Sequence, residues 1–538
     1  MIKYDYIIIG AGSAGCVLAN RLTEDPENEV LLLEAGGRDS NPFIKIPAAY
    51  GNLHRSGVDW GFTTEPQDHI YNRRIYLPRG KTLGGCSSTN AMAYVRGNAS
   101  DYDKWAKLGN RGWSYREVLP YFIKSENNED VNNDYHGQGG PLHVSFAKQF
   151  QTPLARAFIE GCKEVLHLKE NNDYNGAKQE GTGLFQFNIK NGKRHSGVDA
   201  FLRPAMKRKN LHIITRAMVK EILIKNDQAC GVAWIDARSK QEHKAEVAKE
   251  VLLCAGSFQS PQLLMLSGIG HADLLKQHRI PLKQSLPGVG QNLQDHLFYF
   301  ISALSPSKSG YNQHLKPIAK AKALMQWLIN RRGPLTISPL EACAFFKVFD
   351  APSVNMQFHF TPIHAGHPDD PNVDVYNADT YPTDKDGFTI LPSLIQPYSR
   401  GYVSIRSNNP FDAPVIQPNF LEDDRDLQLL VEGGRRAIDV IQSNAMSAYV
   451  ETLIAPLDKS EEGLIAHIKQ TVETIYHPVG TCKMGCDEAA VVNDKLQVHN
   501  IANLRVVDAS VMPTIISGNT NAAVYMIAEK AADMIMND

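Results

Sequence analysis

The sequence lacks the closely spaced cysteine pairs that redox motifs and zinc sites use. Its eight cysteines are scattered along the chain as Cys16, Cys86, Cys162, Cys230, Cys254, Cys343, Cys482 and Cys486. None of them has a partner at CxxC spacing, and no His or Cys pair at ligand spacing accompanies Cys482 and Cys486. We therefore expect no metal site and a reducing compartment.

Long hydrophobic runs and an excess of one charge are also missing. No stretch of about 18 residues is both apolar and uncharged, which excludes a membrane-spanning helix. The formal net charge is -2 at pH 7, so the charge gives no reason to expect nucleic acid as a partner. The first apolar run has no basic leader and follows Asp5, which argues against a secretory signal peptide. A cytoplasmic protein is expected.

The sequence does contain, near its start, the pattern of a dinucleotide-binding unit. Residues 4–22 read as a buried strand, a glycine turn and a helix, with Gly10, Gly12 and Gly15 spaced as GxGxxG. The first glycine permits a tight turn, the second lets the backbone approach a pyrophosphate, and the third allows the helix to pack closely on the strand. Strand, glycines and helix in this order predict a dinucleotide site.

The rest of the unit narrows the choice of dinucleotide. Ser13 and Ala14 open the helix, whose free N–H groups and positive dipole end face the phosphates. Glu34 ends the second strand, 19 residues after Gly15. A carboxylate there accepts a hydrogen bond from a ribose 2′-OH and repels a 2′-phosphate. FAD or NAD fits and NADP does not, and the spacing does not separate FAD from NAD.

Two later segments predict further strands of the same sheet. One strand ends at Gly256 and is followed by a helix with Ser260 as N-cap, Pro261 at its first position and Gly268 after its end. A second strand ends at Asp508 and precedes a helix over residues 522–536.

The middle of the chain differs, because residues 305–469 alternate short strand-like runs such as "NMQFHF", "FTILPSLIQ" and "GYVSIRS" with helical ones. We expect an α/β protein whose Rossmann-like nucleotide domain carries an inserted α+β domain built on an antiparallel sheet. The nucleotide domain is assigned to residues 1–150, 192–304 and 470–538. The substrate domain is assigned to residues 151–191 and 305–469.

Four segments together resemble the glucose–methanol–choline family of FAD-dependent alcohol oxidoreductases over essentially the whole chain. They are "GAGSAG" with "LEAGG", "PRGKTLGGCSSTNAMAYVRG", "GSFQSPQLLMLSGIG", and "YHPVGTCKMG" with "VVDASVMPTIISGNTNAAVYMIAEKAADMI". Within the family the chain looks most like bacterial choline and alcohol dehydrogenases. The resemblance implies FAD, and an activity that oxidises a primary alcohol to an aldehyde.

The resemblance also implies which residues surround the cofactor. Beyond the glycine motif and Glu34 these are Ala35, Gly80, Thr82, Gly84, Gly85, Asn90, Ala91, Val219, Ala255, Gly256, Asp508, Ala509, Thr520 and Asn521. Thr89 stands where some members carry a histidine that attaches the flavin. Threonine cannot form that link, so non-covalent FAD is expected.

By the same resemblance, His477 in "TIYHPVGTCKMG" is the catalytic base. Alcohol oxidation removes a poorly acidic hydroxyl proton while a hydride passes to flavin N5, and imidazole has a suitable pKa of about 6.5 for that proton. A second residue beside the base falls in "SGNTNAA". The alignment favours Asn519 as this partner and Asn521 as a flavin contact, and it leaves the reverse open.

Two residues of the inserted segment are substrate candidates. Glu341 aligns with a carboxylate that meets the quaternary ammonium in choline-acting relatives, and a structural or entrance carboxylate is its alternative interpretation. His359 aligns with a histidine that orients substrate in some members, and a core histidine is equally compatible. His359, His364 and His367 do not predict a metal site, because Pro362 and Gly366 prevent one helical face.

The acceptor and location are open to a further interpretation. Residues 315–333 predict a helix with an apolar side and several Lys and Arg residues, as in helices that lie on anionic membranes. Peripheral attachment at the inner membrane would suit a quinone-like acceptor, with oxygen as the alternative. A helix that packs on its own domain is the simpler interpretation.

The competing functions are choline oxidation, a hydroxynitrile-lyase activity without flavin turnover and a flavoprotein scaffold.

Overall fold

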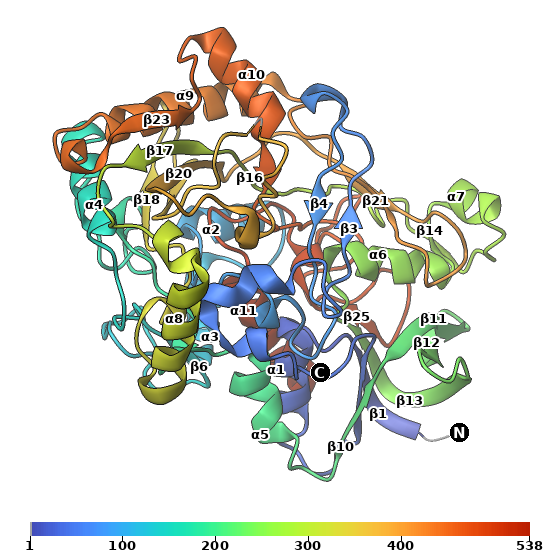
Figure 1. Ribbon diagram of the computed structural model, residues 1–538. Coiled ribbons are helices and arrows are strands. Elements are labelled where there is room, and N and C mark those ends of the chain that lie inside the picture. The colour runs from blue at the N-terminus through green and yellow to red at the C-terminus, as the bar shows by residue number, and fades with distance from the viewer. Residues whose placement is uncertain (1–2, 369) are drawn as a thin grey trace.

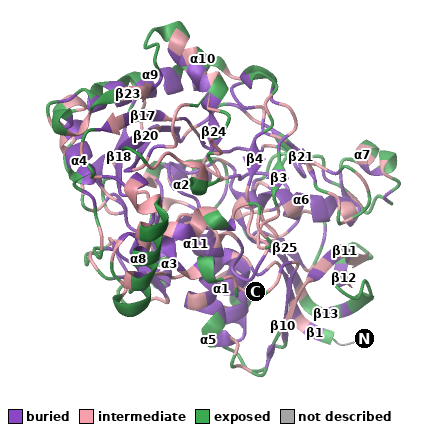
Figure 2. Cartoon of the chain, viewed as in Figure 1, coloured by how far each residue is buried: buried purple, intermediate pink, exposed green. Residues whose placement is uncertain are grey.

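The computed structural model describes residues 3–368 and 370–538, and two β-sheets organise them (Figure 1). The first sheet lies around the N-terminus and the second lies with helices α4, α9 and α10 at the other end of the molecule. Two large groups of buried hydrophobic side chains accompany the sheets, one for each. Figure 2 shows the buried strands inside and exposed helical surfaces outside.

The first sheet has seven strands. Its strands are β10 (Leu211–Thr215), β2 (Val30–Glu34), β1 (Lys3–Ile9), β13 (Glu242–Leu253), β12 (Gln228–Asp236) and β11 (Ala217–Lys225), with β25 (Leu504–Val506) also paired to β13. β10, β2, β1, β13 and β25 run parallel, whereas β11 and β12 are antiparallel additions. The continuous apolar runs of β1 and β2 are buried on both faces, as parallel strands require.

Helices cover this sheet. α11 (Asn521–Asn537) packs on both α1 (Ser13–Leu22) and α3 (Tyr115–Ser125), and α6 (Gly256–Leu266) contacts β11. The strand, turn and helix predicted from the glycine motif are therefore confirmed, as is the C-terminal helix. The Rossmann-like class is confirmed with them.

The second sheet has eight strands, all antiparallel to their neighbours. Its strands are β23 (Thr452–Ala455), β17 (Ile301–Ser305), β20 (Asp386–Leu394), β19 (Met356–Thr361), β18 (Ala342–Phe346), β7 (Gly181–Leu184), β16 (Leu297–Phe298) and β24 (Glu473–Thr474). α4 (Pro153–Val165) and α9 (Asp424–Ile441) pack against it, and α10 (Glu461–Thr471) packs on α9. The predicted antiparallel sheet is confirmed.

The course of the chain differs in places from the predicted domain limits. β16 and all but the last residue of β17 fall within residues 192–304, and β24 falls within residues 470–538, yet all three hydrogen bond into the second sheet. The strand predicted from "GYVSIRS" is β21 (Tyr402–Ser404). It pairs only with β22 (Val415–Gln417) and contacts α6 instead of joining the second sheet. The division into domains stays a prediction.

Helix α6 corrects one predicted boundary. It begins at Gly256, so Ser260 and Pro261 lie inside the helix and Ser260 is not its N-cap. Proline at position 261 leaves the carbonyl of Ser257 without its helical donor, and the hydroxyl of Thr481 donates to that carbonyl at 2.6 Å. A tertiary contact therefore replaces the missing bond. Gly268 follows the helix with φ +88°, as predicted.

Short elements complete the fold. They are α2 (Ala99–Lys107), α5 (Arg203–Ala205), α7 (Ala272–Gln277), α8 (Pro317–Asn330), β3 (Phe62–Thr63), β4 (Tyr76–Leu77), β5 (Glu126–Asn128), β6 (Leu142–Val144), β8 (Ile189–Lys190), β9 (Lys193–Arg194), β14 (Ile269–Gly270) and β15 (Gln284–Ser285). Within residues 3–368 and 370–538, none of the helices combines the length and apolar character needed to cross a bilayer.

Candidate active site

One cavity brings together most of the predicted site residues, from both sheets. His477, Asn519 and His359 line it together with Gly10, Gly12, Ser13, Ala14, Glu34, Ala35, Gly80, Gly85, Asn90, Ala91, Val219, Ala255, Gly256, Asp508, Ala509, Thr520 and Asn521. Four predicted residues do not line it, namely Gly15, Thr82, Gly84 and Glu341. Their contacts, described below, explain why.

The glycine turn has the shape that a dinucleotide requires. A Cβ on Gly10 would lie 2.5 Å from the Cys254 carbonyl oxygen, and a Cβ on Gly15 would lie 1.9 Å from the Gly10 carbonyl oxygen. Gly15 therefore packs α1 against β1 and does not face the cavity. A Cβ on Gly12 would meet only the Cys254 oxygen, at 4.0 Å. Gly12 keeps open the space into which a pyrophosphate fits.

Glu34 is fixed at the end of β2 by backbone amides. Its Oε2 accepts a hydrogen bond from the Ala11 amide at 2.9 Å, and its Oε1 accepts one from the Gly36 amide at 2.7 Å. Burial raises the pKa of Glu34 to about 7, and the two amide donors oppose this effect. Each carboxylate oxygen keeps a second lone pair, so the group can still accept from a ribose hydroxyl.

The loop at residues 79–93 forms another wall of the cavity. Arg79, Cys86, Thr89 and Met92 line it in addition to the predicted residues. Gly84 and Thr82 do not line the cavity and hold the loop in place, so their contact with the cofactor stays a prediction. The Gly84 amide donates to the Ala11 carbonyl at 2.7 Å, and the Thr82 hydroxyl donates to the Gly37 carbonyl at 3.2 Å.

Asp508 fixes the start of α6 in the cavity. Its Oδ2 accepts hydrogen bonds from the Ser260 hydroxyl at 2.6 Å and from the Gly256 amide at 2.9 Å. The carboxylate is buried, and burial raises its pKa. The hydroxyl predicted to cap a helix thus serves to hold an aspartate.

The backbone around His477 is held from several directions. Tyr476, just before it, has φ +65°, a conformation that costs a non-glycine residue energy and persists only where neighbours enforce it. Arg79 Nη2 donates to the Tyr476 carbonyl at 2.5 Å, and the Ser257 hydroxyl donates to the Pro478 carbonyl at 2.6 Å. The His477 amide donates to Asp295 Oδ1 at 2.8 Å. His477 therefore has a fixed position in the cavity wall.

Both ring nitrogens of His477 have partners. Asn519 Nδ2 lies 3.3 Å from His477 Nε2, and His296 Nδ1 lies 3.0 Å from His477 Nδ1. With the Asn519 amide nitrogen toward the ring, Nε2 accepts, and the proton of the neutral ring is on Nδ1. That proton is donated to His296 Nδ1. The arrangement leaves a lone pair on His477 Nε2, on the side of Asn519.

The protonation of His296 agrees with this tautomer. The ring is fully buried, and burial lowers its pKa to about 3, so it is neutral at pH 7. The backbone carbonyls of Ile395 and Ile516 favour a proton on this ring. Because Nδ1 accepts from His477, the proton of the neutral ring belongs on Nε2, a buried nitrogen that makes no hydrogen bond of its own within the described residues.

The electrostatic surroundings keep His477 neutral as well. Its pKa lies well below the usual value, first because the ring is buried and then because His296, His359 and Arg79 lie nearby. Asp295, which holds its amide, is also buried, and burial raises the pKa of this carboxyl to about 6. A neutral imidazole, whose Nε2 lone pair accepts only the long 3.3 Å contact from Asn519, can take a proton when that contact is exchanged.

The two candidate asparagines are separated by their contacts. Asn519 lies against His477, and its Oδ1 is buried without a hydrogen-bond partner. Asn521 begins α11, and its Oδ1 accepts from the hydroxyl of Ser13 at 2.7 Å, next to the glycine turn. The structure therefore brings Asn519 to the histidine and Asn521 to the cofactor side, as the favoured alignment has it.

Of the two substrate candidates, only His359 reaches the cavity. Its Nδ1 lies 3.0 Å from the Ser393 hydroxyl, and burial lowers its pKa to about 3 against the raising effect of the neighbouring Asn519 side chain. Glu341 is buried behind the wall. Its oxygens accept from the Thr152 amide at 3.1 and 3.2 Å, from the Thr152 hydroxyl at 2.6 Å and from the hydroxyl of Tyr311. These donors hold the carboxylate away from the cavity.

His296 and Asp295 are site residues that sequence reasoning missed. They follow β15 in "GQNLQDH", 181 and 182 residues before His477. In the sequence, the adjacent Asp and His of "GQNLQDH" were the available indication of a site. Within the described chain no cluster of His, Cys, Asp or Glu is arranged to hold a metal ion.

The fold and the site can now be compared with known proteins. The sequence model described as GMC oxidoreductase matches residues 4–298 with its N-terminal part and residues 397–528 with its C-terminal part. The chain belongs to the GMC oxidoreductase family. Its cofactor is FAD, and the open glycine turn, Glu34 and the loop at residues 79–93 fit this group.

Similar proteins include enzymes that act on different alcohols. An alcohol dehydrogenase [acceptor] of Pseudomonas putida is 42% identical, over 99% of this chain and 96% of its own length. An oxygen-dependent choline dehydrogenase of Sinorhizobium fredii is 39% identical over the same shares. Among solved structures, pyridoxine 4-oxidase from Mesorbium loti has a TM-score of 0.88 at 30% identity and covers 99% of both chains. An FAD-dependent oxidoreductase from Chaetomium thermophilum has a TM-score of 0.89 at 27% identity, also over 99% of both chains.

Proposed function

We propose that this protein is an FAD-dependent dehydrogenase of uncharged primary alcohols, which it oxidises to aldehydes. Membership of the GMC family and the named relatives support oxidation of an alcohol or of choline. The observation that carries the finer proposal is the neutral His477, whose Nε2 lone pair lies beside Asn519 in the cavity wall. This is the acceptor that a hydroxyl proton needs.

In this proposal His477, His296 and Asn519 have different roles. His477 Nε2 takes the hydroxyl proton, and the contact with His296 holds the proton already on Nδ1 in place. The long 3.3 Å contact from Asn519 exchanges easily, so its amide can donate to the alcohol oxygen instead. FAD, when bound in this cavity, would supply the hydride acceptor, its N5 atom. The buried histidines around this point keep water out of the site.

An apolar lining favours an uncharged alcohol over choline. The second sheet and its flanks contribute Phe298, Leu340, Leu391 and Ile475 to the cavity. The carboxylates among the described lining residues are Glu34 and Asp508, which are engaged at the glycine turn and at α6. A quaternary ammonium here would lack a paired negative charge, which is costly in a buried site. The choline-dehydrogenase relatives motivate choline as the competing substrate.

Anaerobic flavin reduction tests the proposal. The yellow holoprotein is mixed without oxygen with octanol, benzyl alcohol or choline, and flavin bleaching is followed. We expect an uncharged alcohol to bleach the flavin at least about tenfold faster than choline at equal concentration. Faster reduction by choline would refute the substrate class. No bleaching by any of them would favour a lyase or a scaffold.

Two variants sharpen the test. His477→Ala should stay yellow and reduce about 10²- to 10⁴-fold more slowly, the usual contribution of a general base. Glu341→Gln should keep the parent's preference among the alcohols, because Thr152 and Tyr311 hold this side chain outside the cavity. A selective loss of choline turnover in Glu341→Gln would show that the carboxylate meets the substrate after all.

The electron acceptor in this proposal is a quinone-like carrier, with peripheral contact to a membrane. One relative is named for an acceptor that its name does not specify, and another is named oxygen-dependent, so oxygen is the competing acceptor. The measurement is reoxidation of the reduced flavin by a soluble quinone compared with oxygen. Faster reoxidation by oxygen would contradict the assignment.

A further inference from the structure

Helix α8 (Pro317–Asn330) is attached to the molecule by a narrow strip. Only Ala323 and Trp327, one turn apart, are buried. Trp327 packs with Ile46, Ala49 and Leu335, and its indole N–H donates to the Gly192 carbonyl at 2.8 Å. The remainder of the helix is exposed or half-buried, and Figure 2 shows it largely as exposed surface.

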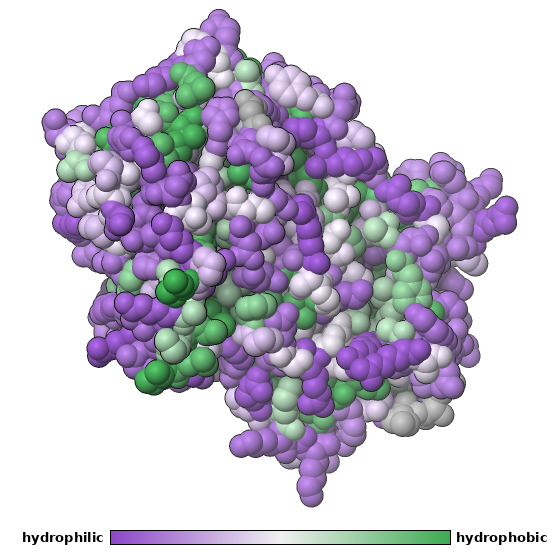
Figure 3. All heavy atoms as spheres, in the orientation of Figure 1, coloured by the Kyte–Doolittle hydropathy of each residue, from purple (hydrophilic) through white to green (hydrophobic). Residues whose placement is uncertain are grey.

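The exposed side of α8 is apolar. Ile318 is 86%, Ile329 82% and Met325 58% exposed, and Leu324 and Leu328 are exposed as well. A helix turns about 100° per residue, which puts Ile318, Met325 and Ile329 on one stripe, with Leu324 and Leu328 beside it. Ala323 and Trp327 lie on the opposite side. In Figure 3 this apolar face appears as a group of hydrophobic spheres over α8.

The orientation of this apolar face is the reverse of that found in an ordinary surface helix. A helix that only packs on its own domain turns its apolar stripe inward, whereas α8 directs aliphatic side chains to solvent. Contiguous exposed apolar patches on folded proteins mark surfaces that bind a partner or a membrane. The simpler interpretation of this segment, a helix packed by its apolar side, does not fit these contacts.

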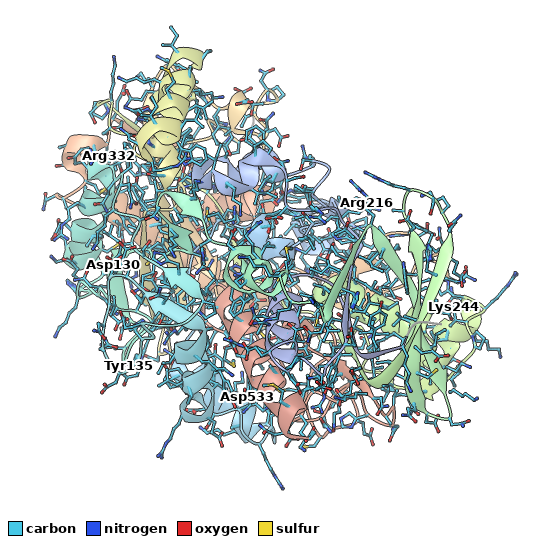
Figure 4. All side chains as sticks on the ribbon, turned by 90° about the horizontal axis from the view of Figure 1, so that it is seen from below. Asp130, Tyr135, Arg216, Lys244, Arg332 and Asp533 are labelled. Atoms are coloured by element: carbon cyan, nitrogen blue, oxygen red, sulfur yellow. The ribbon has the colours of Figure 1, made fainter. Side chains whose placement is uncertain are left out.

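The flanks of the face are basic. Residues 316–332 contain Lys316, Lys320, Lys322, Arg331 and Arg332 and no Asp or Glu. Lys320 pairs with Asp379, and Arg331 lies over the Trp327 ring. Lys316, Lys322 and Arg332 form no ion pair within the described residues. Figure 4, seen from below, shows α8 at the periphery with Arg332 near its end.

We propose that the apolar face of α8, with its basic flanks, docks this protein onto the surface of an anionic lipid bilayer. Aliphatic side chains insert at the boundary of headgroups and acyl chains, while Lys and Arg meet the anionic headgroups. A second copy of the chain fits less well, because two such faces would bring like charges together. The chain as a whole has a net charge of -2, so the positive charge of residues 316–332 is a local feature.

The face lies next to a wall of the cavity. Trp327 packs on the short helical segment Pro47–Leu53, whose Tyr50 lines the cavity, and Leu340, five residues after Leu335, lines it too. Docking would therefore bring the substrate cavity close to the source of lipophilic alcohols and quinones. This benefit rests on the proposed function, whereas the docking itself rests on α8 alone.

Vesicle flotation of the holoprotein tests the docking. The protein is mixed with vesicles of phosphatidylcholine alone or with phosphatidylglycerol added, and the yellow fraction that floats is measured. We expect binding to the anionic vesicles, with a marked loss at high salt. Absence of binding to anionic vesicles would overturn the proposal. Flavin bleaching without vesicles is measured in parallel, so failure of docking is distinguishable from failure of the proposed function.

Matched variants assign the binding to α8. The triple variant Ile318→Ser, Met325→Ser, Ile329→Ser should lose at least tenfold in vesicle binding. Leu457→Ser, at another exposed leucine, is its control and should bind like the parent. Replacement of Lys316, Lys322 and Arg332 by Gln should weaken binding to anionic vesicles about a hundredfold. All variants should reduce their flavin with a soluble alcohol as the parent does.

Two outcomes would contradict the role of α8. One is a triple serine variant that floats as well as the parent. The other is a parent that forms dimers in solution and does not float, with the serine variant monomeric. That result would assign the face to a second copy of this chain.

Discussion

At the scale of single residues, the contact between His477 and His296 decides which nitrogen can act as base. Between the two neutral rings, whose Nδ1 atoms face each other, there is one proton. The Asn519 amide donates to His477 Nε2, so this proton is bound to His477 Nδ1. His296 is thus a positioning residue, because it acts on the reaction through His477 and not on the substrate.

Replacing His296 tests this role. His296→Asn keeps an acceptor, because Asn Oδ1 occupies about the place of the imidazole Nδ1, whereas His296→Leu has similar size and no acceptor. We expect flavin reduction by octanol to slow about 10²-fold in the leucine variant and less than tenfold in the asparagine variant. Equal losses in both variants would show that His296 is only part of the core packing. Stopped-flow spectrophotometry under anaerobic conditions provides the rates.

The lowered pKa of His477 predicts the pH dependence of the same step. The base form is present above the pKa and is lost as the pH falls through it. Because burial and the neighbouring His296, His359 and Arg79 lower this pKa, the rate constant should stay constant from pH 8 to 6.5 and fall only at lower pH. His296 is neutral in this range and accepts the Nδ1 proton of His477, so in His296→Leu, where that acceptor is lost, the fall should not move to higher pH. A parent profile with its midpoint at or above 6.5 would contradict the neutral buried base.

The site residues differ in how far sequence could predict them. His477 and Asn519 could be assigned because their motifs align with the family, and the glycines because their spacing is local. The contact of His296 with His477 spans 181 residues, and the Thr152 donors that draw Glu341 from the cavity are 189 residues away from it. Such long-range hydrogen bonds decide where a polar side chain points and leave no local pattern.

At the scale of secondary structure, two glycines of the turn between β1 and α1 have different roles. Gly15 is needed for folding, and Gly12 is needed for cofactor binding. Gly15→Ala would put a methyl group 1.9 Å from the Gly10 carbonyl oxygen, a contact between backbone atoms that cannot relax cheaply. Gly12→Ala would meet only the Cys254 oxygen at 4.0 Å, on the side open to the cofactor.

These two glycine variants should therefore fail differently. We expect Gly15→Ala to lower the free energy of unfolding by about 3 kcal/mol, as overpacked core sites do, or to prevent folding. Gly12→Ala should fold with the thermal midpoint of the apoprotein and bind FAD at least tenfold more weakly. Circular dichroism melts and flavin absorbance distinguish the two. A yellow Gly12→Ala protein with parental affinity would show that the backbone does not approach the cofactor there.

Helix α6 shows why the ends of an element are harder to predict than its presence. Ser260 and Pro261 form a proper helix start by local rules, but Asp508 takes the serine hydroxyl and Thr481 supplies the donor that proline removes. Both partners come from a distant part of the chain. The helix consequently extends back to Gly256, where its first amide donates to Asp508 as well.

At the scale of the whole molecule, two classes of sheet could be predicted because their sequence patterns differ. The glycine unit and the strands that follow its pattern indicated the first sheet, and short strand-like runs between helical ones indicated the second. The strand order could not be predicted in the same way. β16, β17 and β24 enter the second sheet from segments that continue from, or lead into, the first. The cavity lies where these crossings occur, so His477, which follows β24, is held between the sheets.

The cofactor should therefore stabilise the molecule as a whole. The cavity walls come from residues near both ends of the chain and from its middle, and FAD binds only when all of them are assembled. A ligand at 1,000 times its dissociation constant adds about 4 kcal/mol to the free energy of unfolding. The thermal midpoint of the apoprotein should accordingly rise with the logarithm of added FAD, as measured by calorimetry. Gly12→Ala is the matched control, and its midpoint should hardly respond. If the thermal midpoint of the parent protein did not depend on FAD, this would contradict a cofactor that is held by both sheets.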